Sequence, residues 1–312
     1  MNMLVIGAAG FVGPYLVQEM LSKGHRVAVT KLAGESFYAD GAEVYDADVL
    51  NEYELLDVFK KTNPDVVYNL AAQSSVALSW QCMRKTFEIN VLGALNILNV
   101  IRESGRNIRL ILVGSGEEYG SLKDVDMPIS EVFCGSPRNP YAISKSAQTS
   151  IGKMFADAYG MDVIIVRAFN HIGPRQPAGF VVPDFCSQIV AIEKGRAEPV
   201  IRVGNLSARR DFTDVRDIVK GYHALSAAGK SGEIYNIGSG KAVCVMDIFK
   251  KLISFSLCEN ISIETDQARF RHQDVPLVEA DITKLRQETG WQPVIPLDLS
   301  LKETLQFWRD ND

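Results

Sequence analysis

A tyrosine and a lysine at helical spacing carry the clearest chemistry in this sequence. Tyr141 and Lys145 follow Asn139-Pro140, a pair that is typical of a helix N-terminus. Positions i and i+4 share one face of a helix, so the lysine ammonium would lie beside the phenol. A neighbouring positive charge favours the phenolate and lowers the pKa of a tyrosine, which is otherwise about 10. The pair is therefore suited to transferring a proton to or from a substrate oxygen.

The same spacing occurs a second time, at Tyr119 and Lys123. Here Gly120 and Ser121 lie between the two residues, directly after an apolar run, which indicates a loop. A loop does not impose the geometry of one helical turn. We therefore interpret the second match as one without catalytic meaning.

Two polar residues follow the apolar run 108–113 and would lie at the end of that strand. The Ser115 hydroxyl can hydrogen-bond the carbonyl or alcohol oxygen of a substrate there, and Glu117 adds a carboxylate. Gly114 and Gly116 leave an alternative interpretation, since glycine-rich segments also form ordinary turns.

A glycine-rich turn near the N-terminus has the spacing of a phosphate-binding site. The segment Gly7-Ala8-Ala9-Gly10-Phe11-Val12-Gly13 follows an apolar strand and opens a helix. Glycines allow a tight turn and close approach of the backbone to a pyrophosphate, which would sit on the unpaired N–H groups of the helix. A glycine-rich turn without a ligand is the alternative. The segment predicts a dinucleotide site with contacts from Gly7, Gly10, Phe11, Val12 and Gly13.

The residues after the next two strands bear on which dinucleotide would bind. NAD sites usually place a carboxylate at the end of the second strand, for the ribose 2′-hydroxyl. Here the strand ends in Thr30-Lys31, and a cation suits the 2′-phosphate of NADP, so Lys31 favours NADP over NAD. A surface lysine without a ligand is the alternative. Asp48, after the third strand, can accept a hydrogen bond from the adenine amino group or belong to a helix N-terminus.

Alternating apolar runs predict the elements that position these residues. Strand-like runs occur at 3–7, 26–30, 43–46, 65–70, 108–113 and 162–167, with helix-like segments at 11–23, 51–61, 84–104 and 141–159. The alternation predicts an α/β fold, a Rossmann-type doubly wound parallel sheet covered on both faces. After residue 168, prolines shorten the elements, which suits a smaller C-terminal substrate-binding lobe at the carboxyl edge of the sheet. We expect a dinucleotide-binding domain at 1–167, with later returns near 205–240, and the substrate lobe mainly at 168–312.

The composition argues against several other classes of protein. The net charge is −5 and there is no basic stripe, so nucleic-acid binding is not expected. The N-terminus does not read as a signal peptide, and no apolar run has the length of a membrane span. The five cysteines and four histidines lack metal-ligand spacing, so no metal site is expected. Scattered thiols without disulfide spacing favour the cytoplasm.

Two helical segments are apolar around much of their circumference. Segment 87–101 reads FEINVLGALNILNVI, and segment 141–159 carries alanine, isoleucine, methionine and phenylalanine on more than one face. A helix that is apolar all round needs partners on two sides. The partners are either elements of the same subunit or a second copy of the chain, and the second case predicts a homodimer.

With these residues in place, the chain resembles the extended short-chain dehydrogenase/reductase family over nearly its whole length. The shared motifs are GAAGFVG (7–13), NLAAQSSV (69–76), GSGEEYG (114–120), NPYAISK (139–145), RAFNHIGPRQ (167–176), RRDFTDVRDIV (209–219), YNIGSG (235–240), RHQDVP (271–276) and TGWQPVIPL (289–297). The resemblance implies that Ser115, Tyr141 and Lys145 are catalytic. It also implies cofactor contacts from Val49, Leu70, Ala71 and Ala72, and nucleotide-sugar contacts from Gln73, Ser75, Asn170, Arg210, Arg271 and Asp274.

The residue types suit these implied roles, although plain structural roles exist for some of them. Arginine presents a planar fork of donors that matches phosphate oxygens, and the carboxylate of Asp274 can hold ribose hydroxyls. The alternative for Arg210 is a salt bridge with Asp211 or Asp214, and the alternative for Asn170 is a turn satisfied by the backbone.

Within the family, the likeness is greatest to the group that acts on GDP-mannose-derived sugars. The NHIGP run, the stretch 203–219 and RHQDVP look most like GDP-4-keto-6-deoxy-mannose reductases, with GDP-mannose 4,6-dehydratases as the nearby rivals. The arginine- and glycine-rich segment of the dehydratases is not found at 174–180, and Gly116 departs from their usual serine or aspartate. Glu117 keeps the dehydratase hypothesis open, because the C5 base of dehydratases occupies this position.

The resemblance implies an NAD(P)-dependent enzyme and leaves three hypotheses for its function. In the first, NAD(P)H reduces C4 of a GDP-4-keto-6-deoxyhexose to a GDP-6-deoxyhexose of the GDP-rhamnose type. Tyr141 then protonates the C4 oxygen, Lys145 tunes Tyr141 and orients the nicotinamide ribose, and Ser115 hydrogen-bonds the oxygen. In the second, a dehydratase or epimerase regenerates its cofactor within each turnover. In the third, the chain is a regulator that binds a dinucleotide without turnover, which the complete catalytic set argues against.

Overall fold

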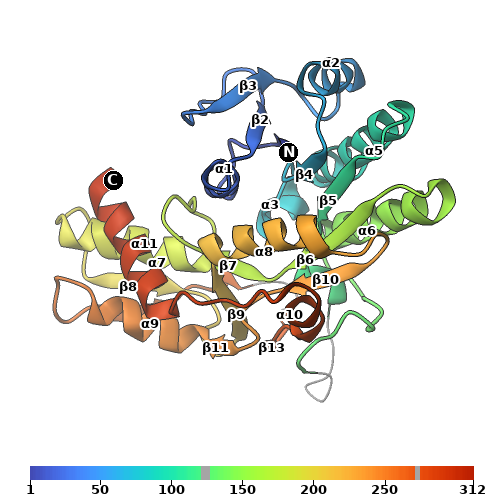
Figure 1. Ribbon diagram of the computed structural model, residues 1–312. Helices are drawn as coiled ribbons and strands as arrows, with labels where there is room; N and C mark the ends of the chain where they lie inside the picture. Colours follow the sequence, from blue (N-terminus) through green and yellow to red (C-terminus); the bar gives the residue numbers. More distant parts are fainter. Residues whose placement is uncertain (121–126, 271–274) are drawn as a thin grey trace.

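The computed structural model describes residues 1–120, 127–270 and 275–312, and its centre is a seven-stranded parallel sheet (Figure 1). The strands are β1 (Asn2–Ile6), β2 (Arg26–Lys31), β3 (Ala42–Asp46), β4 (Val66–Asn69), β5 (Arg109–Val113), β6 (Val163–Ala168) and β10 (Ile234–Ile237). Their order is β10-β6-β5-β4-β1-β2-β3, and every neighbouring pair is parallel. Strands β1 to β6 therefore have the order of a dinucleotide-binding sheet, and the predicted fold class is confirmed.

Helices cover both faces of the sheet, because successive strand residues point to opposite sides. The covering helices are α1 (Gly13–Ser22), α2 (Glu52–Thr62), α5 (Gly93–Glu103), α6 (Pro140–Tyr159) and α8 (Val215–Ala228). Met3 and Val5 of β1 face the core with α1 and α8, whereas Leu4 and Ile6 face the core with α2, α5 and α6. Both sides of the strands are buried, which explains why their sequences are continuous apolar runs.

The segment predicted as one helix at 84–104 is an interrupted helix. It consists of α4 (Met83–Phe87), a π-helical turn η1 (Glu88–Leu92) and α5, and the short α3 (Val76–Gln81) precedes it. Asn90 in the π turn is fully buried. Its amide exchanges two hydrogen bonds with the backbone of Gln73 (2.8 and 3.1 Å) and donates to Ser144 Oγ at 2.9 Å. The π turn thereby ties the loop after β4 to α6.

Helix α6 begins and ends at residues that suit helix termini. The Asn139 side chain accepts the Ala142 N–H at 2.8 Å, and Pro140 is the first helical residue. Gly160 ends the helix with a left-handed φ of 64°. This placement puts Tyr141 in the first turn of α6 and Lys145 one turn later.

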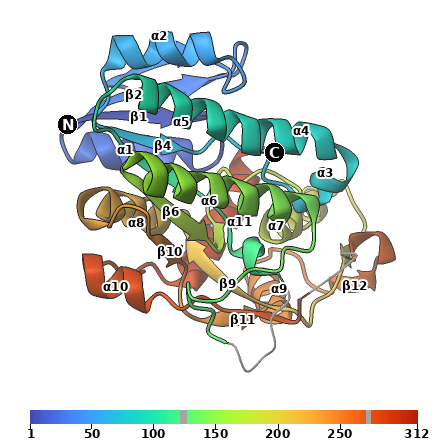
Figure 2. The ribbon, with the colours of Figure 1, turned by 90° about the vertical axis from the view of Figure 1, so that its right-hand side faces the viewer.

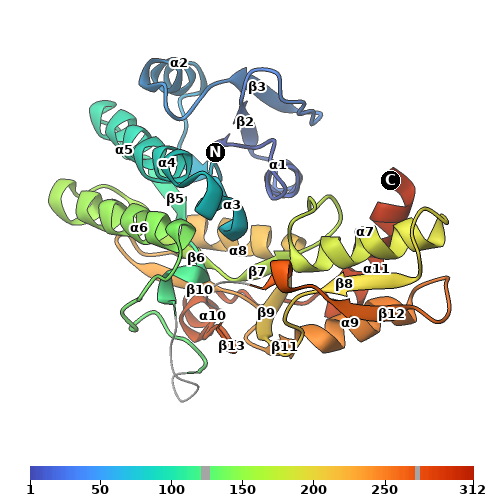
Figure 3. The same ribbon diagram turned by 180° about the vertical axis from the view of Figure 1, so that it is seen from behind.

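The chain builds a smaller lobe after β6 (Figure 3). Its strands are β7 (Asn170–Ile172), β8 (Val200–Val203), β9 (Arg209–Asp214), β11 (Ala242–Cys244), β12 (Ser262–Thr265) and β13 (Leu277–Val278). Strand β9 pairs with β7, β11 and β13, and β8 pairs with β12. Helices α7 (Val181–Glu193), α9 (Val245–Ser254) and α11 (Leu297–Asn311) surround a separate apolar core that includes Phe185 and Phe249.

The chain returns from the smaller lobe to the large sheet. Helix α8 packs against α1, and β10 adds the outermost strand next to β6. Helix α10 (Thr283–Thr289) packs against α8 and β10. None of the helices in the described ranges is long and apolar enough to cross a membrane.

Candidate active site

The glycine-rich turn joins β1 to α1 and packs too closely for side chains at two of its glycines. Gly7 has a left-handed φ of 77°, and a Cβ there would lie 2.7 Å from the backbone of Ala71. A Cβ on Gly13 would lie 1.9 Å from the carbonyl oxygen of Ala8. The Gly7 N–H also donates to Oγ1 of Thr30 at 3.2 Å. The turn therefore requires glycine at both positions.

Gly10 lies at an open position of the same turn. A Cβ on Gly10 would meet only the Gly7 carbonyl oxygen, at 3.7 Å, so the packing of the protein does not explain this glycine. Helix α1 begins here without a side-chain cap, which leaves backbone N–H groups of its first turn for an anion. Gly10 and Phe11 line a cavity of about 760 Å³ together with Lys31 and Arg175. These donors and the open glycine fit a bound pyrophosphate.

The predicted adenosine contacts lie at the carboxyl ends of β2 and β3. The Lys31 ammonium is paired with the Asp46 carboxylate, which offsets part of the charge that favours a 2′-phosphate. The Asp48 carboxylate accepts the Leu50 N–H at 2.9 Å, so it also shapes the turn before α2. Val49 is buried. Each of these residues has a structural partner or a buried place, and their contacts to a cofactor remain a prediction.

The loop after β4 approaches the glycine-rich turn through Ala71. The predicted residues of this loop are Leu70, Ala71, Ala72, Gln73 and Ser75. The Gln73 side chain donates to Thr86 Oγ1 at 3.0 Å and accepts the Ser75 N–H at 2.6 Å. The Ser75 hydroxyl in turn accepts the Leu78 N–H at the start of α3. Gln73 and Ser75 thus maintain the shape of the loop, and their contacts to a substrate remain a prediction.

Ser115 and Tyr141 meet beyond the carboxyl end of β5. Ser115 precedes the short 3₁₀ helix η2 (Gly116–Tyr119), and its Oγ accepts the Glu117 N–H at 3.2 Å. Tyr141 is buried and hydrogen-bonded to Ser115. Burial raises the pKa of Tyr141 well above its ordinary value, and the bond to Ser115 opposes this shift. Tyr141 is therefore held as the neutral phenol, the form that can donate a proton.

The Lys145 ammonium lies at the end of β5, one helical turn from Tyr141. It donates to the carbonyl oxygen of Val113 at 2.8 Å and to Gln148 Oε1 at 3.0 Å. Burial lowers the pKa of Lys145 to about 8, against the opposing charge of Glu118. The sequence predicts that Lys145 lowers the pKa of Tyr141. Burial dominates the tyrosine and raises its pKa overall, so the lowering by Lys145 stays a prediction.

Glu117 lies on η2, close to the same centre. Asn139 donates its side-chain amide to Glu117 Oε2 at 3.2 Å, and the Glu117 charge adds to burial in raising the pKa of Tyr141. The neighbouring Gly116 packs against an aromatic ring, since a Cβ there would lie 3.2 Å from Phe169. The Glu117 charge thus reaches Tyr141, and the position before Glu117 holds a glycine, Gly116, instead of an acid.

The second tyrosine–lysine match has a structural role. Tyr119 is fully buried at the end of η2, and its hydroxyl donates to Asn236 Oδ1 at 2.7 Å. Lys123 lies outside the described residues. Because the Tyr119 hydroxyl is committed to Asn236, Tyr141 remains the tyrosine suited to proton transfer.

The predicted nucleotide-sugar ligands of the smaller lobe divide into two groups. Arg271 and Asp274 lie outside the described residues. Asn170 and Arg210 lie on the adjoining strands β7 and β9, where the Asn170 amide donates to the Asp211 carbonyl oxygen at 3.3 Å. The pairing of these strands brings the two predicted ligands into one small sheet next to the end of β6.

The carboxylates that were alternatives for Arg210 bind other groups. Asp211 accepts the backbone N–H groups of residues 239 and 240, at 2.6 and 2.9 Å. Asp214 accepts Arg216 at 2.7 Å. Arg210 itself is buried and donates to the carbonyl oxygen of Arg209. These contacts anchor β9 and keep the Arg210 backbone in a defined place.

Two residues that contact the centre were not predicted. Gln148 accepts from Lys145 and donates to the Val113 carbonyl oxygen at 2.9 Å. Glu118 Oε1 accepts the Ser115 N–H at 2.8 Å. Gln148 stands three positions after Lys145 on the same helix, a spacing that could have identified it. Glu118 stands three positions after Ser115, the spacing of a capping box, which could have identified its contact with the Ser115 N–H but not its burial.

Comparison with known proteins places the chain in a family. The family model described as GDP-mannose 4,6 dehydratase matches residues 4–304. The chain is 31% identical to the GDP-6-deoxy-D-mannose reductase of Pseudomonas aeruginosa, over 98% of this chain and 97% of that protein. It is 29% identical to GDP-mannose 4,6 dehydratase 2 of Arabidopsis thaliana, over 96% of this chain and 84% of that protein.

A solved structure agrees with these sequence matches. RMD from Pseudomonas aeruginosa, complexed with NADPH, superposes with a TM-score of 0.89 and 29% identity, and the match covers 100% of both chains. Sequence and fold agree along the whole length. The chain therefore belongs to the GDP-mannose 4,6-dehydratase family, within the extended short-chain dehydrogenases/reductases.

Proposed function

We propose that this protein is an NADPH-dependent reductase that converts a GDP-4-keto-6-deoxyhexose to a GDP-6-deoxyhexose of the GDP-rhamnose type. The observation that carries the proposal is the buried set of Ser115, Tyr141 and Lys145 at the carboxyl edge of the sheet, the edge that also carries a turn that fits a pyrophosphate. The relative named GDP-6-deoxy-D-mannose reductase supports the substrate. The solved structure with NADPH supports the cofactor, as does Lys31 at the end of β2.

The glycine-rich turn and the strand ends around it would hold the cofactor. The proposed contacts are Gly7, Gly10, Phe11, Val12, Gly13, Lys31, Asp48, Val49, Leu70, Ala71 and Ala72, with Tyr141 and Lys145 at the nicotinamide ribose. NADPH, when bound, supplies the hydride that reduces the C4 carbonyl and is itself oxidised to NADP⁺.

The three polar residues would complete the reduction of the carbonyl. Tyr141, as the neutral phenol, donates its proton to the C4 oxygen, which becomes the product hydroxyl. The Lys145 ammonium stabilises the phenolate that remains on Tyr141. Ser115, which is hydrogen-bonded to Tyr141, would turn its hydroxyl proton to the C4 oxygen when the substrate is bound.

We propose that the smaller lobe binds most of the nucleotide sugar. Residues 1–167, with the return of α8 and β10, would bind the dinucleotide, and the rest of 168–312 would bind the substrate. The proposed substrate contacts are Gln73, Ser75, Asn170, Arg210, Arg271 and Asp274. Arginine suits the pyrophosphate of the GDP moiety because its planar fork matches phosphate oxygens.

A single-turnover assay with two substrates tests the reductase function. The protein is mixed with GDP-4-keto-6-deoxy-mannose or with GDP-mannose, each with NADPH, and the absorbance of NADPH and the sugar product are followed. We expect stoichiometric loss of NADPH with the keto sugar and none with GDP-mannose. Loss of NADPH with neither substrate would overturn the proposal. If no sugar product forms from either substrate as well, the result favours a regulator that binds the dinucleotide without turnover.

A dehydratase is the second candidate, because Glu117 stands where dehydratases of the family have their C5 base and is bound by Asn139 at the centre. The glycine at 116 argues against it, since no acid lies there to protonate a leaving hydroxyl. Conversion of GDP-mannose without net change in NADPH, abolished in Glu117→Gln, would establish the dehydratase. For the reductase, Glu117→Gln is expected to retain most of the activity on the keto sugar.

The Gly10→Ala variant is expected to bind NADPH about tenfold more weakly, equivalent to about 1.4 kcal/mol. A methyl group at this open position meets no close neighbour in the protein, so the melting temperature should not change. Gly13→Ala is the contrasting variant, because its Cβ would clash with the Ala8 carbonyl oxygen and should destabilise the fold. Fluorescence titration and thermal melts check both. Unchanged NADPH affinity in Gly10→Ala would contradict the proposed pyrophosphate site.

The pH dependence of the reduction should reflect Lys145. Its pKa of about 8 means that the ammonium is present below pH 8 and is lost as the pH rises through that value. Because the ammonium stabilises the Tyr141 phenolate, kcat/KM for the keto sugar should be constant at lower pH and fall above about pH 8. A kcat/KM that rises through this range would contradict the assignment of Tyr141 as acid.

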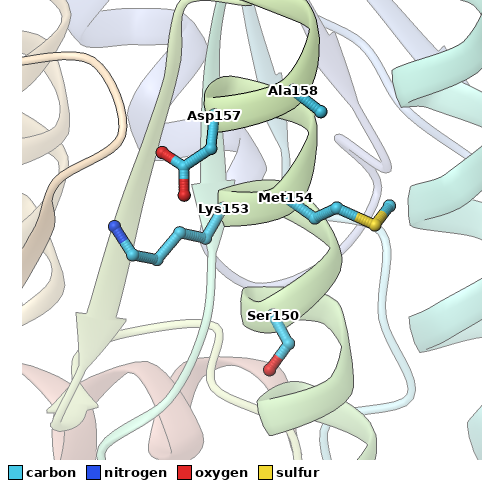
Figure 4. A pocket seen from close by; sticks show the side chains of 5 residues that line it. All are labelled: Ser150, Lys153, Met154, Asp157 and Ala158. Carbon is cyan, nitrogen blue, oxygen red and sulfur yellow. The ribbon is translucent and has the colours of Figure 1, made fainter.

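We propose that the protein forms a homodimer through α4, α5 and α6, which lie on one outer side of the molecule (Figure 2). Exposed apolar residues gather on α4 and α6, on the neighbouring α3 and on the π turn η1 that joins α4 to α5: Leu78, Trp80, Met83, Leu92, Ile143 and Met154. A shallow pocket on α6 is lined by residues 150–158, with Met154 projecting from its outer face (Figure 4). Monomers rarely expose so many large apolar side chains together.

Sedimentation equilibrium tests the dimer. We expect a mass of twice the 34.4 kDa chain for the protein and a shift to the monomer for Leu92→Glu, which places a charge on the proposed interface. Val132→Glu, on an exposed apolar residue outside these helices, is the control. A monomeric wild-type protein would contradict the proposal.

We place the enzyme in the cytoplasm, because its five cysteines are free and suit a reducing compartment. Cell fractionation, with detection of the protein in the cytoplasmic fraction, checks this location.

A further inference from the structure

A carboxylate without exposure to solvent lies directly behind Ser115. Glu118, on η2, is 0% exposed. Its Oε1 accepts the backbone N–H of Ser115 at 2.8 Å, and the Glu118 N–H donates back to the Ser115 carbonyl oxygen at 3.1 Å. A buried charge is costly unless it is paired and hydrogen-bonded. The second carboxylate oxygen, Oε2, therefore needs a positively charged partner.

Arg167 on β6 is that partner. Its Nε donates to Glu118 Oε2 at 3.0 Å, and both side chains are buried. The guanidinium also stacks on the Tyr119 ring, 4.4 Å from the centroid, and Tyr119 is held by Asn236 of β10. The charge pair therefore connects the segment after β5 to the neighbouring strands β6 and β10.

The lack of a side chain at Gly114 leaves the space that the Glu118 carboxylate occupies. A Cβ on Gly114 would lie 2.4 Å from Glu118 Oε1, so a side chain at 114 would displace it. The Gly114 N–H donates to the Val166 carbonyl oxygen at 2.8 Å, which places Gly114 beside β6, one residue from Arg167. Gly114 and Glu118 thus complement each other on the two sides of Ser115.

We propose that Glu118, held by Arg167, is a positioning residue that keeps Ser115 oriented toward the C4 oxygen of the substrate. The proposal rests on the proposed reductase function. Glu118 acts through the Ser115 backbone, because its one oxygen holds the Ser115 N–H while the other is occupied by the guanidinium. The Ser115 Oγ accepts the Glu117 N–H from the same short helix, so a change in the Ser115 backbone also turns its hydroxyl.

The charge of Glu118 also acts on Lys145. Burial lowers the pKa of Lys145, and Glu118 opposes that shift. The carboxylate therefore keeps the lysine charged over a wider range of pH than burial alone would allow.

Two double variants separate positioning from stability. Arg167 is replaced by methionine in both, so that no buried charge is left unpaired. Glu118→Gln/Arg167→Met keeps an amide oxygen that can accept the Ser115 N–H, whereas Glu118→Leu/Arg167→Met removes the acceptor. Reduction of GDP-4-keto-6-deoxy-mannose by NADPH is measured for both variants and for the wild type, together with NADPH affinity and thermal melts.

The leucine variant is expected to lose roughly 30-fold in kcat relative to the glutamine variant, less than the roughly 100- to 1000-fold that complete loss of an aligned donor costs, because the Ser115 hydroxyl is misplaced and not removed. The KM for NADPH should be similar in the two, whereas the melting temperature of the leucine variant should be lower, because the buried Ser115 N–H loses its acceptor. Equal kcat values in the two variants would overturn the proposal. If either variant is unstable, Gly114→Ala supplies a second route, since its methyl group displaces the carboxylate and should also lower kcat.

A mutant cycle with Ser115→Ala tests whether Glu118 acts through Ser115. In the Ser115→Ala background, exchange of glutamine for leucine at 118 should no longer change kcat, because the hydroxyl to be positioned is absent. Independent, multiplying losses would assign Glu118 a purely structural role. A wild-type protein that does not turn over the keto sugar would instead overturn the proposed function, which the wild-type assay reveals before any variant is compared.

Discussion

Replacement of Tyr141 by phenylalanine is expected to lower kcat for reduction of the 4-keto sugar by roughly 1000-fold, within the range of general acid catalysis. The phenol is buried, hydrogen-bonded to Ser115, and kept in its protonated form by a raised pKa. Phenylalanine preserves the ring and its packing and removes only the proton donor. NADPH affinity and the melting temperature should therefore change little, and single-turnover kinetics with the keto sugar measure the loss.

Tyr119→Phe is the matched control, since Tyr119 has the same spacing to a lysine in the sequence. Its hydroxyl donates to Asn236, so the variant leaves a buried acceptor without its partner and should lower stability by about 1–3 kcal/mol. Its kcat should stay far above that of Tyr141→Phe. If Tyr141→Phe kept most of the wild-type rate, or if Tyr119→Phe lost as much, the assignment of the acid would be wrong.

Replacement of Lys145 by methionine is expected to lower kcat by roughly 100-fold, because the phenolate on Tyr141 loses its neighbouring charge. Unlike kcat, the stability of the folded protein should not decrease in this variant. Burial lowers the folded-state pKa of Lys145 from 10.5 to about 8, so the folded protein disfavours the ammonium, and this cost is present at pH values below 8. Methionine carries no charge, so the melting temperature at neutral pH should not fall.

Lys153→Met, two helical turns further along α6, is the matched control. Lys153 is on the surface and donates to the Gly232 carbonyl oxygen, away from Tyr141. Its kcat should equal that of the wild type. The fall in kcat/KM above about pH 8 should also disappear in Lys145→Met and persist in Lys153→Met. A wild-type pH profile in Lys145→Met would show that another group titrates in this range.

Much of the fold was predictable because its signals are local. The apolar runs of β1 and β5 are buried on both faces of a parallel sheet, and such strands read as continuous hydrophobic segments. The start of α6 was equally clear, because Asn139 and Pro140 act on the first turn of their own helix. The glycine at 13 is also a local signal, since its close contact with Ala8 lies within the strand–turn–helix connection, whereas Gly7 meets Ala71 of a distant loop.

The energetic balance at the site was not predictable from these signals. The spacing of Tyr141 and Lys145 gave their places on one helix, but it did not indicate that burial raises the pKa of Tyr141. Desolvation of the phenol depends on what covers it, and this is set by packing between distant segments. The pairing of Lys31 with Asp46 likewise depends on the neighbouring strands β2 and β3, which lie side by side only in the folded sheet.

The sequence by itself determined the parallel sheet, the glycine-rich turn, and the helix that carries Tyr141 and Lys145, because hydrophobic period, caps and turn residues act within a few positions. Only the tertiary structure decided that Glu118, whose contact with the Ser115 N–H is a local capping box, is buried against Arg167, 49 positions away. A glutamate beside glycines in a turn has no local reason to be buried. Its place follows from the meeting of η2 with β6, where a long-range charge pair compensates the loss of water.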